Sequence, residues 1–340
     1  MSGMLRTVVL SAAIVAAGSA AADEVAEFYK GKTVTVVVGN EVGTGFDIYA
    51  RVLARHLGRH IPGRPNLVVQ NMVGASGITA TNWLYHAAPK DGTVIATFVH
   101  TVPFEPLMGN TAAKYDAAKL SWIGNMESII GICAVSKQAG LAHFDDLFVK
   151  ETVFGATGAT GAVAKYALAI KNLLGGKIKL VAGYKGTANL KLAMLQGEVG
   201  GLCALGMSTV TSAWRNEFES GAIRPLVQTG GGKHPMLAGV PRIDSYAKSE
   251  EDLAVFRLIF GTHELGRIFA TPPGIAVERR NALRSAFNAT MKDPQFLADA
   301  AKTQIDIAPS SGEEVEAFIA RVVASPPAIV ERAKQAVRND

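Results

Sequence analysis

The sequence is poor in several features that define whole classes of protein. It has only 2 cysteines among 340 residues, 7% of its residues are aromatic and 19% are charged. Two cysteines are too few for a disulfide framework. The formal net charge of +5 is spread along the chain without a basic block, which argues against a nucleic-acid-binding surface. No run of the mature sequence approaches the ~20 apolar residues that a membrane-spanning helix needs.

The first 22 residues have the pattern of a secretory signal peptide. Arg6 precedes an apolar run over residues 7–17, and small residues follow up to Ala22. This order of charged, apolar and small residues is typical of an export signal. We therefore expect cleavage near Ala22 and a periplasmic location for the mature chain. Neither cysteine lies near this cut, so no lipid anchor is expected.

The remaining sequence repeats one pattern: a short apolar run, a glycine-rich turn and a segment of helical period. This pattern predicts an α/β fold with parallel strands and crossover helices. Its length exceeds what one hydrophobic core usually organises, so we expect two lobes joined by a hinge, with a cleft between them. One lobe is predicted to comprise residues 23–125 and 225–340, and the other residues 126–224. The strand predicted over residues 223–228 is expected to return the chain to the first lobe.

Three glycine-rich turns each stand between a predicted strand and a predicted helix, at residues 39–47, 73–77 and 155–161. In parallel α/β sheets such turns meet at the carboxyl edge of the strands, where helix amino termini present unpaired N–H groups. Such an edge favours an anion. The hydroxyl groups of Thr44, Ser76, Thr157 and Thr160 add further donors. Any single turn is equally consistent with a tight turn that has no ligand.

Charged and titratable side chains near these turns allow more than one interpretation. Asp47 stands at the start of a helix, where it either caps the backbone or contacts a ligand. Glu41 would repel an anion unless it meets an amine, a hydroxyl group or water. His56 and His60 have a metal-clamping spacing, but they lie on a polar face without a third ligand, so no metal site is expected. His100 follows a buried strand and is expected near the cleft.

The sequence offers little support for nucleotide binding or catalysis. GTGFDI has Ile48 where the third glycine of a dinucleotide motif should stand, and no turn has the P-loop lysine. Ser76 in GASG and Ser208 in GMST do not match the G-x-S-x-G elbow of serine hydrolases. We therefore expect no enzyme and no cofactor. The alternative is an exported serine esterase that uses Ser76 or Ser208 with His100.

Cys133 and Cys203 both lie in apolar, strand-like segments, GICAV and GGLCAL. They are either free buried cysteines or, if their strands are neighbours in an oxidising compartment, one disulfide.

The order of these segments resembles the periplasmic solute receptors of tripartite tricarboxylate transporters, the Bug or TctC-like family. GKTVTVVVGNEVGTGFDIYARVLARHL is similar to the family's opening strand, P-F-x-x-G-G-x-x-D turn and A-R helix. VVQNMVGASGITATNWLYHAAPKDGTVI is similar to its E-N-r-x-G-A-g-G and A-x-P-D-G-y-T-l segments. FGATGATGAVAKYA, YKGTANLKLAMLQGEV and IRPLVQTGGGKHPMLAGVP follow in the family's order. In contrast, Gly39-Asn40-Glu41 replaces the usual Pro-Phe, and RLIFGTHELGRIFATPPG departs from the family's pattern.

The resemblance implies a type II periplasmic-binding fold, a monomer, and a membrane permease as partner. It also implies a ligand carboxylate held by backbone N–H groups, hydroxyl groups and water. By position, the implied ligand-binding residues are Thr44, Gly45, Asp47, Ala75, Ser76, Gly77, His100, Thr101, Val102, Thr157, Thr160, Gly161, Tyr184, Lys185, Leu205 and Ser208. Glu41, which departs from the family's pattern, is added as a candidate contact because it lies in the first turn. The ligand itself stays open among citrate-like, dicarboxylic, aromatic and amino acids.

Overall fold

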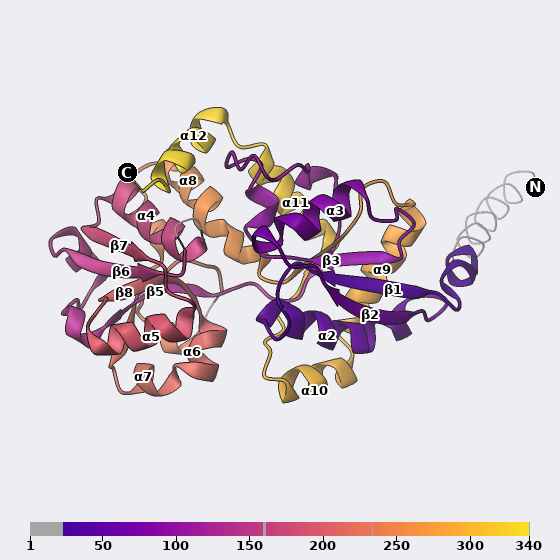
Figure 1. Ribbon diagram of the computed structural model, residues 1–340, viewed down its shortest axis with the longest axis horizontal. Helices are drawn as coiled ribbons and strands as arrows, with labels where there is room; N and C mark the ends of the chain where they lie inside the picture. Colours follow the sequence, from indigo (N-terminus) through magenta and orange to yellow (C-terminus); the bar gives the residue numbers. More distant parts are fainter. Residues whose placement is uncertain (1–22, 159–160, 233, 340) are drawn as a thin grey trace, which may run out of the picture. The chain divides into compact units, whose positions relative to one another are not determined.

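The computed structural model describes residues 23–158, 161–232 and 234–339, and the predicted signal peptide lies outside them. The chain divides into two compact units (Figure 1). Unit 1 holds residues up to Val102, Ala112–Met126 and Arg267–Ile319. Unit 2 holds Pro103–Thr111, Glu127–Gly266 and the chain from Ala320 onward. Each unit is built on its own β-sheet.

The sheet of unit 1 has six strands in the order β11-β4-β10-β3-β1-β2. Its strands are β1 (Thr33–Val38), β2 (Asn66–Asn71), β3 (Val94–Thr97), β4 (Ser121–Asn125), β10 (Ile268–Thr271) and β11 (Ser310–Ser311). β1 pairs in parallel with both β2 and β3, so their carboxyl ends share one edge. β10 is antiparallel to its neighbours β3 and β4.

Helices cover both faces of this sheet (Figure 1). They are α2 (Gly45–Leu57), α3 (Ile78–His86), α9 (Val277–Thr290), α10 (Pro294–Lys302) and the first part of α11 (Gly312–Val323). The helical spacing of Tyr49, Val52 and Leu53 places them on one face of α2, where they join Val36 and Phe287 in a buried cluster. Burial of each such aliphatic side chain contributes roughly 1.5–3 kcal/mol. The cluster thereby packs α2 against β1.

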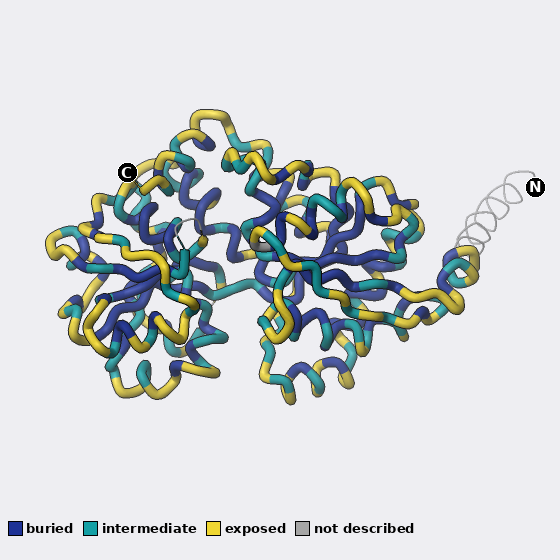
Figure 2. Tube along the Cα trace, viewed as in Figure 1, coloured by how far each residue is buried: buried dark blue, intermediate teal, exposed yellow. Residues whose placement is uncertain are grey.

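The sheet of unit 2 has five strands in the order β7-β6-β8-β5-β9. Its strands are β5 (Gly131–Ser136), β6 (Thr152–Ala156), β7 (Ile178–Ala182), β8 (Gly201–Gly206) and β9 (Ile223–Gln228). The helices of unit 2 are α4 (Ala162–Leu174), α5 (Thr187–Gln196), α6 (Met207–Ala213), α7 (Arg215–Glu219), α8 (Glu250–Phe260) and α12 (Pro327–Ala336). Strand β5, between β8 and β9, is buried along its whole length (Figure 2).

The two sheets repeat one topology. In each, the first parallel strand lies between the second and third, and an antiparallel strand separates the third from the fourth. β10 is that antiparallel strand in unit 1, and β5 is its counterpart in unit 2. This arrangement is the mixed α/β class that the sequence predicted.

The boundaries between the units differ from the expected lobes. The strand over residues 223–228 forms as predicted, but it stays in unit 2. There β9 pairs with β5, with Ile223 opposite Ser136 and Gln228 opposite Ile132. The segments 225–266 and 320–340 therefore belong to unit 2 rather than to the first lobe. Packing of α12 against α8 and α4 holds the carboxyl-terminal segment there.

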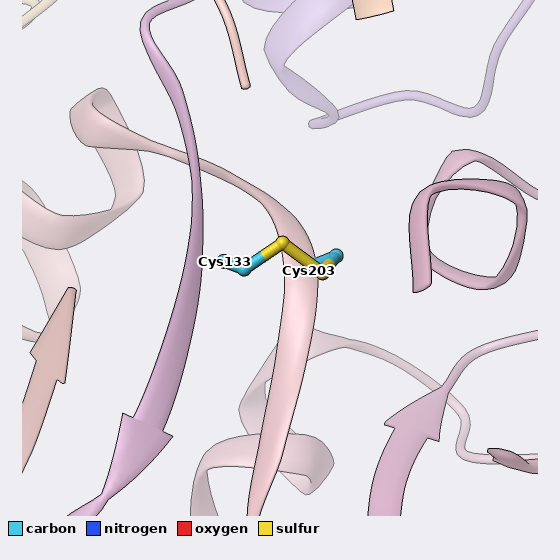
Figure 3. Close-up of a disulfide and its surroundings, with 2 residues drawn as sticks. All are labelled: Cys133 and Cys203. Carbon is cyan, nitrogen blue, oxygen red and sulfur yellow. A yellow bond between two sulfur atoms is a disulfide. The ribbon is translucent and has the colours of Figure 1, made fainter. Parts of the chain in front are cut away.

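Cys133 and Cys203 form a disulfide between the neighbouring strands β5 and β8 (Figure 3). Their Cα atoms lie 3.9 Å apart, and both side chains are fully buried. The bridged alternative is therefore correct, and the free-cysteine alternative is wrong. In the part of the chain that the structure describes, no helix is long and apolar enough to span a membrane.

Candidate functional site

Three loops of unit 1 meet where the parallel strands β1, β2 and β3 end. A Cβ atom added to Gly39 would lie 3.0 Å from the Cα atom of Gly77 and 3.2 Å from the Cβ atom of Phe98. A Cβ atom on Gly77 would likewise lie 3.1 Å from that of Phe98. Glycine at positions 39 and 77 therefore accommodates this close approach, which any larger residue would crowd. Within unit 1, the first two glycine-rich turns and the loop after the third strand come together as predicted.

The first loop leaves the start of α2 open to an anion. Thr44 is the N-cap residue, but its side chain makes no capping hydrogen bond to the helix. Its hydroxyl group instead donates to the carbonyl oxygen of Glu41, at 2.8 Å. The N–H groups of Gly45, Phe46 and Asp47 form the first turn, where a helix supplies no backbone acceptor and carries partial positive charge. Gly45 is exposed, so this end of the helix is accessible on unit 1.

Asp47 fixes the shape of the first loop. Its side chain is buried, and its Oδ2 atom accepts hydrogen bonds from the Gly43 N–H group and from Arg51 Nε, both at 2.9 Å. Burial by itself would raise the pKa of Asp47, but the hydrogen bonds from Arg51, Gly43 and Asn71 outweigh burial and hold this pKa below its usual value. The carboxylate is therefore ionised and neutralised inside the protein. This geometry matches the capping interpretation of Asp47.

Asn71 ties the first loop to the second. Its Nδ2 group donates to Asp47 Oδ1 and to the carbonyl oxygen of Asn40, each at 2.9 Å, while its Oδ1 atom accepts from Arg51 at 3.1 Å. Sequence reasoning missed Asn71 and Arg51 as supporting residues. Two signals could have found them. Arg51 stands four residues after Asp47 on the same helix face, and Asn71 is a polar residue at the end of an apolar strand.

The second loop has an unusual backbone that glycine makes possible. Gly74 and Gly77 have positive φ values of 152° and 98°, and Ala75 between them has φ 45°. A Cβ atom on Gly74 would lie 2.4 Å from Thr79 Oγ1. The backbone of Ala75, Ser76 and Gly77 forms a single 3-10 turn just before α3. Its conformation is set by the fold, because an unsupported non-glycine residue avoids positive φ.

The predicted residues of the third loop are mostly buried, unlike the exposed Gly45 of the first loop. Val102 is buried, its methyl group lies 3.5 Å from the Cβ position of Gly77, and its carbonyl oxygen accepts from the Tyr115 hydroxyl group at 2.6 Å. Val102 therefore supports the loops from within the core. His100 is also buried, whereas Thr101 is partly exposed.

An arginine that the sequence did not single out lies beside the first loop. Arg267 places a guanidinium nitrogen 3.1 Å from the Cβ position of Gly45. Its guanidinium carbon stands 4.6 Å from the ring centre of Phe46 and 4.7 Å from that of Tyr49. These cation–π contacts fix the group against the first turn of α2. Its position 222 residues after Gly45 gave no local signal.

The candidate residues of unit 2 also follow parallel strands. Thr157 comes directly after β6, and Tyr184 follows β7, where its N–H group donates to the carbonyl oxygen of Ala156 at 3.3 Å. The Tyr184 hydroxyl group donates to Glu198 at 2.6 Å, and this hydrogen bond raises the pKa of Tyr184 to about 12. Gly161 is the N-cap of α4. Thr160 lies outside the described residues.

Leu205 packs in the core of unit 2, and the backbone of Ser208 accepts hydrogen bonds within α6. The Leu205 side chain is buried, and it packs there with other apolar side chains. The carbonyl oxygen of Ser208 accepts hydrogen bonds from Thr211 and Ser212 in α6. Lys185 is exposed.

The two histidines with metal-clamping spacing are paired with Asp299 of α10 and with Asp293, the N-cap residue of that helix. His56 Nε2 lies 2.7 Å from Asp299, and His60 Nε2 lies 2.8 Å from Asp293. Across the residues that the structure describes, no group of three or more histidine, cysteine, aspartate or glutamate side chains is arranged to hold a metal ion.

No family model matches the chain, and no curated protein matches its sequence. Solved structures do match its fold. The chain is similar to a TctC solute-binding protein from Polaromonas, with a TM-score of 0.68 and 19% identity over 91% of this chain and 99% of that chain. It is also similar to the periplasmic binding protein BugD, with a TM-score of 0.63 and 19% identity over 91% of this chain and 98% of that chain.

A third similar structure is MatC from Rhodopseudomonas palustris, which was solved with bound malate. Its TM-score is 0.60, with 17% identity over 90% of this chain and 99% of that chain. These likenesses show that the chain has the two-lobed α/β fold of periplasmic solute-binding proteins, and the predicted fold class is confirmed.

Proposed function

We propose that this chain is an exported solute-binding protein of the Bug or TctC kind, which binds a small organic acid and delivers it to a membrane transporter. The observation that carries the proposal is the meeting of three loops at the open amino terminus of α2 in unit 1. Gly39 and Gly77 allow the loops to approach closely. The N–H groups of Gly45 and Phe46 then supply donors for a ligand carboxylate.

The charge balance of the first loop supports an anionic ligand. Asp47 is the acid closest to the helix start in sequence, and its charge is matched by Arg51 and by two further hydrogen bonds. The buried carboxylate therefore opposes a bound anion only weakly. Glu41 is exposed and its carbonyl oxygen is held by Thr44. A ligand that also carries a hydroxyl group or an amine would suit this acid.

Malate is a fitting first probe, because MatC has the same fold and holds malate. Malate carries two carboxylates and one hydroxyl group. Citrate-like, aromatic and amino acids remain candidates for the natural ligand, and the same assay ranks them. The binding equilibrium requires no covalent chemistry, since a ligand shifts a receptor toward the state that it binds best.

Two substitutions at one position test the proposal. In Thr44→Asp, a carboxylate stands at the N-cap, a position that aspartate stabilises. It should weaken malate binding at least ~10-fold, because a like charge a few ångströms away costs on the order of 1–4 kcal/mol near a protein surface. Thr44→Asn has the same shape without the charge and should bind nearly as well as the unmodified protein. Isothermal titration calorimetry measures both affinities.

Equal affinity of the Asp and Asn variants would refute an anion site at the start of α2. No binding of malate or of any acid in the panel by the unmodified protein would refute the carboxylate class altogether.

A periplasmic location, a monomeric state and a permease partner belong to the same proposal. The buried disulfide between Cys133 and Cys203 supports export, because such bridges form and persist in oxidising compartments. Light scattering of the purified protein tests the monomer. Nothing in the described part of the chain favours the exported serine esterase.

A further inference from the structure

Unit 2 contains a pocket whose described lining includes none of the predicted ligand-binding residues. It has a volume of about 610 Å³ and opens where β9 ends. Its lining residues are Gln228, Gly232, His234, Pro235, Leu237, Ala238 and Arg242. The volume falls in the range of small-molecule sites, roughly 300–1,000 Å³.

The lining combines an apolar wall with nitrogen donors. Leu237 is buried, and Pro235 and Ala238 lie beside it in sequence. His234 Nδ1 accepts a hydrogen bond from the Met236 N–H group at 3.2 Å. An imidazole nitrogen that accepts carries no proton, so the proton of neutral His234 is on Nε2, which is then a donor. The same contact fixes the orientation of the ring.

Two further polar side chains of the pocket are held in place by backbone groups. Gln228 Nε2 donates to the carbonyl oxygen of Val240 at 2.6 Å, which leaves its amide oxygen as the acceptor of this side chain. Arg242 donates to the carbonyl oxygen of Gly230 at 3.3 Å and to Asp244 at 3.0 Å. Its guanidinium group has five N–H donors in total, so these two bonds leave it donors for a ligand.

Arg242 is ion-paired with Asp244, and its charge also acts on Glu264. Burial raises the pKa of Glu264, the charges of Arg321, Arg242 and Arg257 act in the opposite direction, and Asp244 adds to the rise. A preorganised guanidinium group with N–H donors to spare is suited to a carboxylate or another planar anion.

We infer that this pocket binds a small organic anion with an apolar body. The anionic group meets Arg242 and His234 Nε2, and the apolar body lies against Leu237 and its neighbours. This inference does not depend on the anion site proposed at the start of α2, because all of its lining residues belong to unit 2. A second site of this kind would let the protein respond to an organic acid other than the one that it transports.

The experiment uses benzoate, which combines one carboxylate with an apolar ring. Benzoate binding is measured by calorimetry on the unmodified protein and on Arg242→Gln and His234→Asn. Asn at position 234 keeps a side-chain acceptor for the Met236 N–H group and removes the Nε2 donor. Each variant should bind benzoate about tenfold more weakly, which is the loss expected for one charge-assisted hydrogen bond. Arg215→Gln, on the exposed helix α7 of the same unit, should bind benzoate normally.

A second titration separates this pocket from the site in unit 1. Benzoate should bind with unchanged affinity when malate is saturating, and it should bind normally to Thr44→Asp. Loss of benzoate binding in Thr44→Asp, or displacement by malate, would overturn the inference, as would absence of benzoate binding. If Arg242→Gln fails to fold, the test rests on His234→Asn. Unchanged benzoate affinity in that variant would also overturn the inference. Failure of malate to bind would instead count against the proposed function alone.

Discussion

Asn71 donates a hydrogen bond to the buried carboxylate of Asp47 at 2.9 Å, and this contact joins the end of β2 to the first turn of α2. The same amide group holds Asn40 in the first loop. The position of the first loop relative to the second is therefore set by side chains that need not touch a ligand. This relationship leads to the first prediction.

Replacement of Asn71 by alanine should destabilise the protein by about 1–3 kcal/mol, because the buried Asp47 carboxylate loses a donor. Malate affinity should fall as well, since the first loop loses its tie to the second. Urea unfolding measures the stability, and calorimetry measures the affinity. Asn66→Ala, at the exposed start of the same strand, is the matched control and should change both values little. Wild-type stability in Asn71→Ala would show that this contact has no structural role.

Gly39→Ala tests the close approach of the loops. The added methyl group would lie 3.0 Å from the backbone of Gly77, which side-chain rotation cannot relieve. We expect a loss of stability of about 1–3 kcal/mol, as is usual for overpacking, together with weaker malate binding. In Gly231→Ala the new methyl group meets no atom within 4 Å, and this variant should unfold like the unmodified protein. If both variants behaved alike in thermal unfolding, the steric argument for position 39 would fail.

The disulfide of unit 2 should contribute strongly to its stability. Cys133 and Cys203 close a loop with a sequence separation of 70 residues. A bridge over such a loop stabilises a protein by roughly 3–4.7 kcal/mol in the chain-entropy model. The double variant Cys133→Ala/Cys203→Ala should therefore melt well below the unmodified protein. Addition of a reductant to denaturant titrations should shift the unmodified protein toward the variant and leave the variant unchanged. If the reductant also destabilised the variant, the lower stability of the variant could not be attributed to the missing disulfide.

The ion pairs between α2 and α10 should make stability depend on pH in the acid range. Hydrogen bonds from Arg55 and His56 lower the pKa of Asp299 from 3.8 to about 2. A carboxylate with a lowered pKa stabilises the folded state above its unfolded pKa, and this stabilisation is lost as the pH falls through its folded pKa. The stability difference between the unmodified protein and Asp299→Asn should thus be full above pH 3.8 and vanish toward pH 2. A difference that persists unchanged at pH 2 would contradict this assignment.

Local patterns predicted much of the fold. β9 has the bounds that its apolar run indicated, residues 223–228. The convergence of the first three loops also followed from a general rule, since parallel strands end at one edge. The membership of β9 was predicted wrongly, because the partner of a strand depends on pairing with β5, which lies far away in the sequence.

The supporting residues of the site were harder to predict. Asn71 and Arg267 act through contacts with residues 24 and 222 positions away, at Asp47 and Gly45, and no motif links such pairs. Glycines at positions 39 and 77 were interpreted as turn formers, and the structure shows that they also let two loops approach closely. Val102 and Leu205 came from the family resemblance, and their burial shows that position in a segment does not determine which way a side chain points.

The most direct test of the anion site is the change in backbone amide resonances of isotopically labelled protein on addition of malate. The account predicts that the N–H groups of Gly45 and Phe46, together with those of residues 75–77, shift most within unit 1 and saturate along one binding curve. Malate binding that leaves these amides unmoved would contradict the central claim.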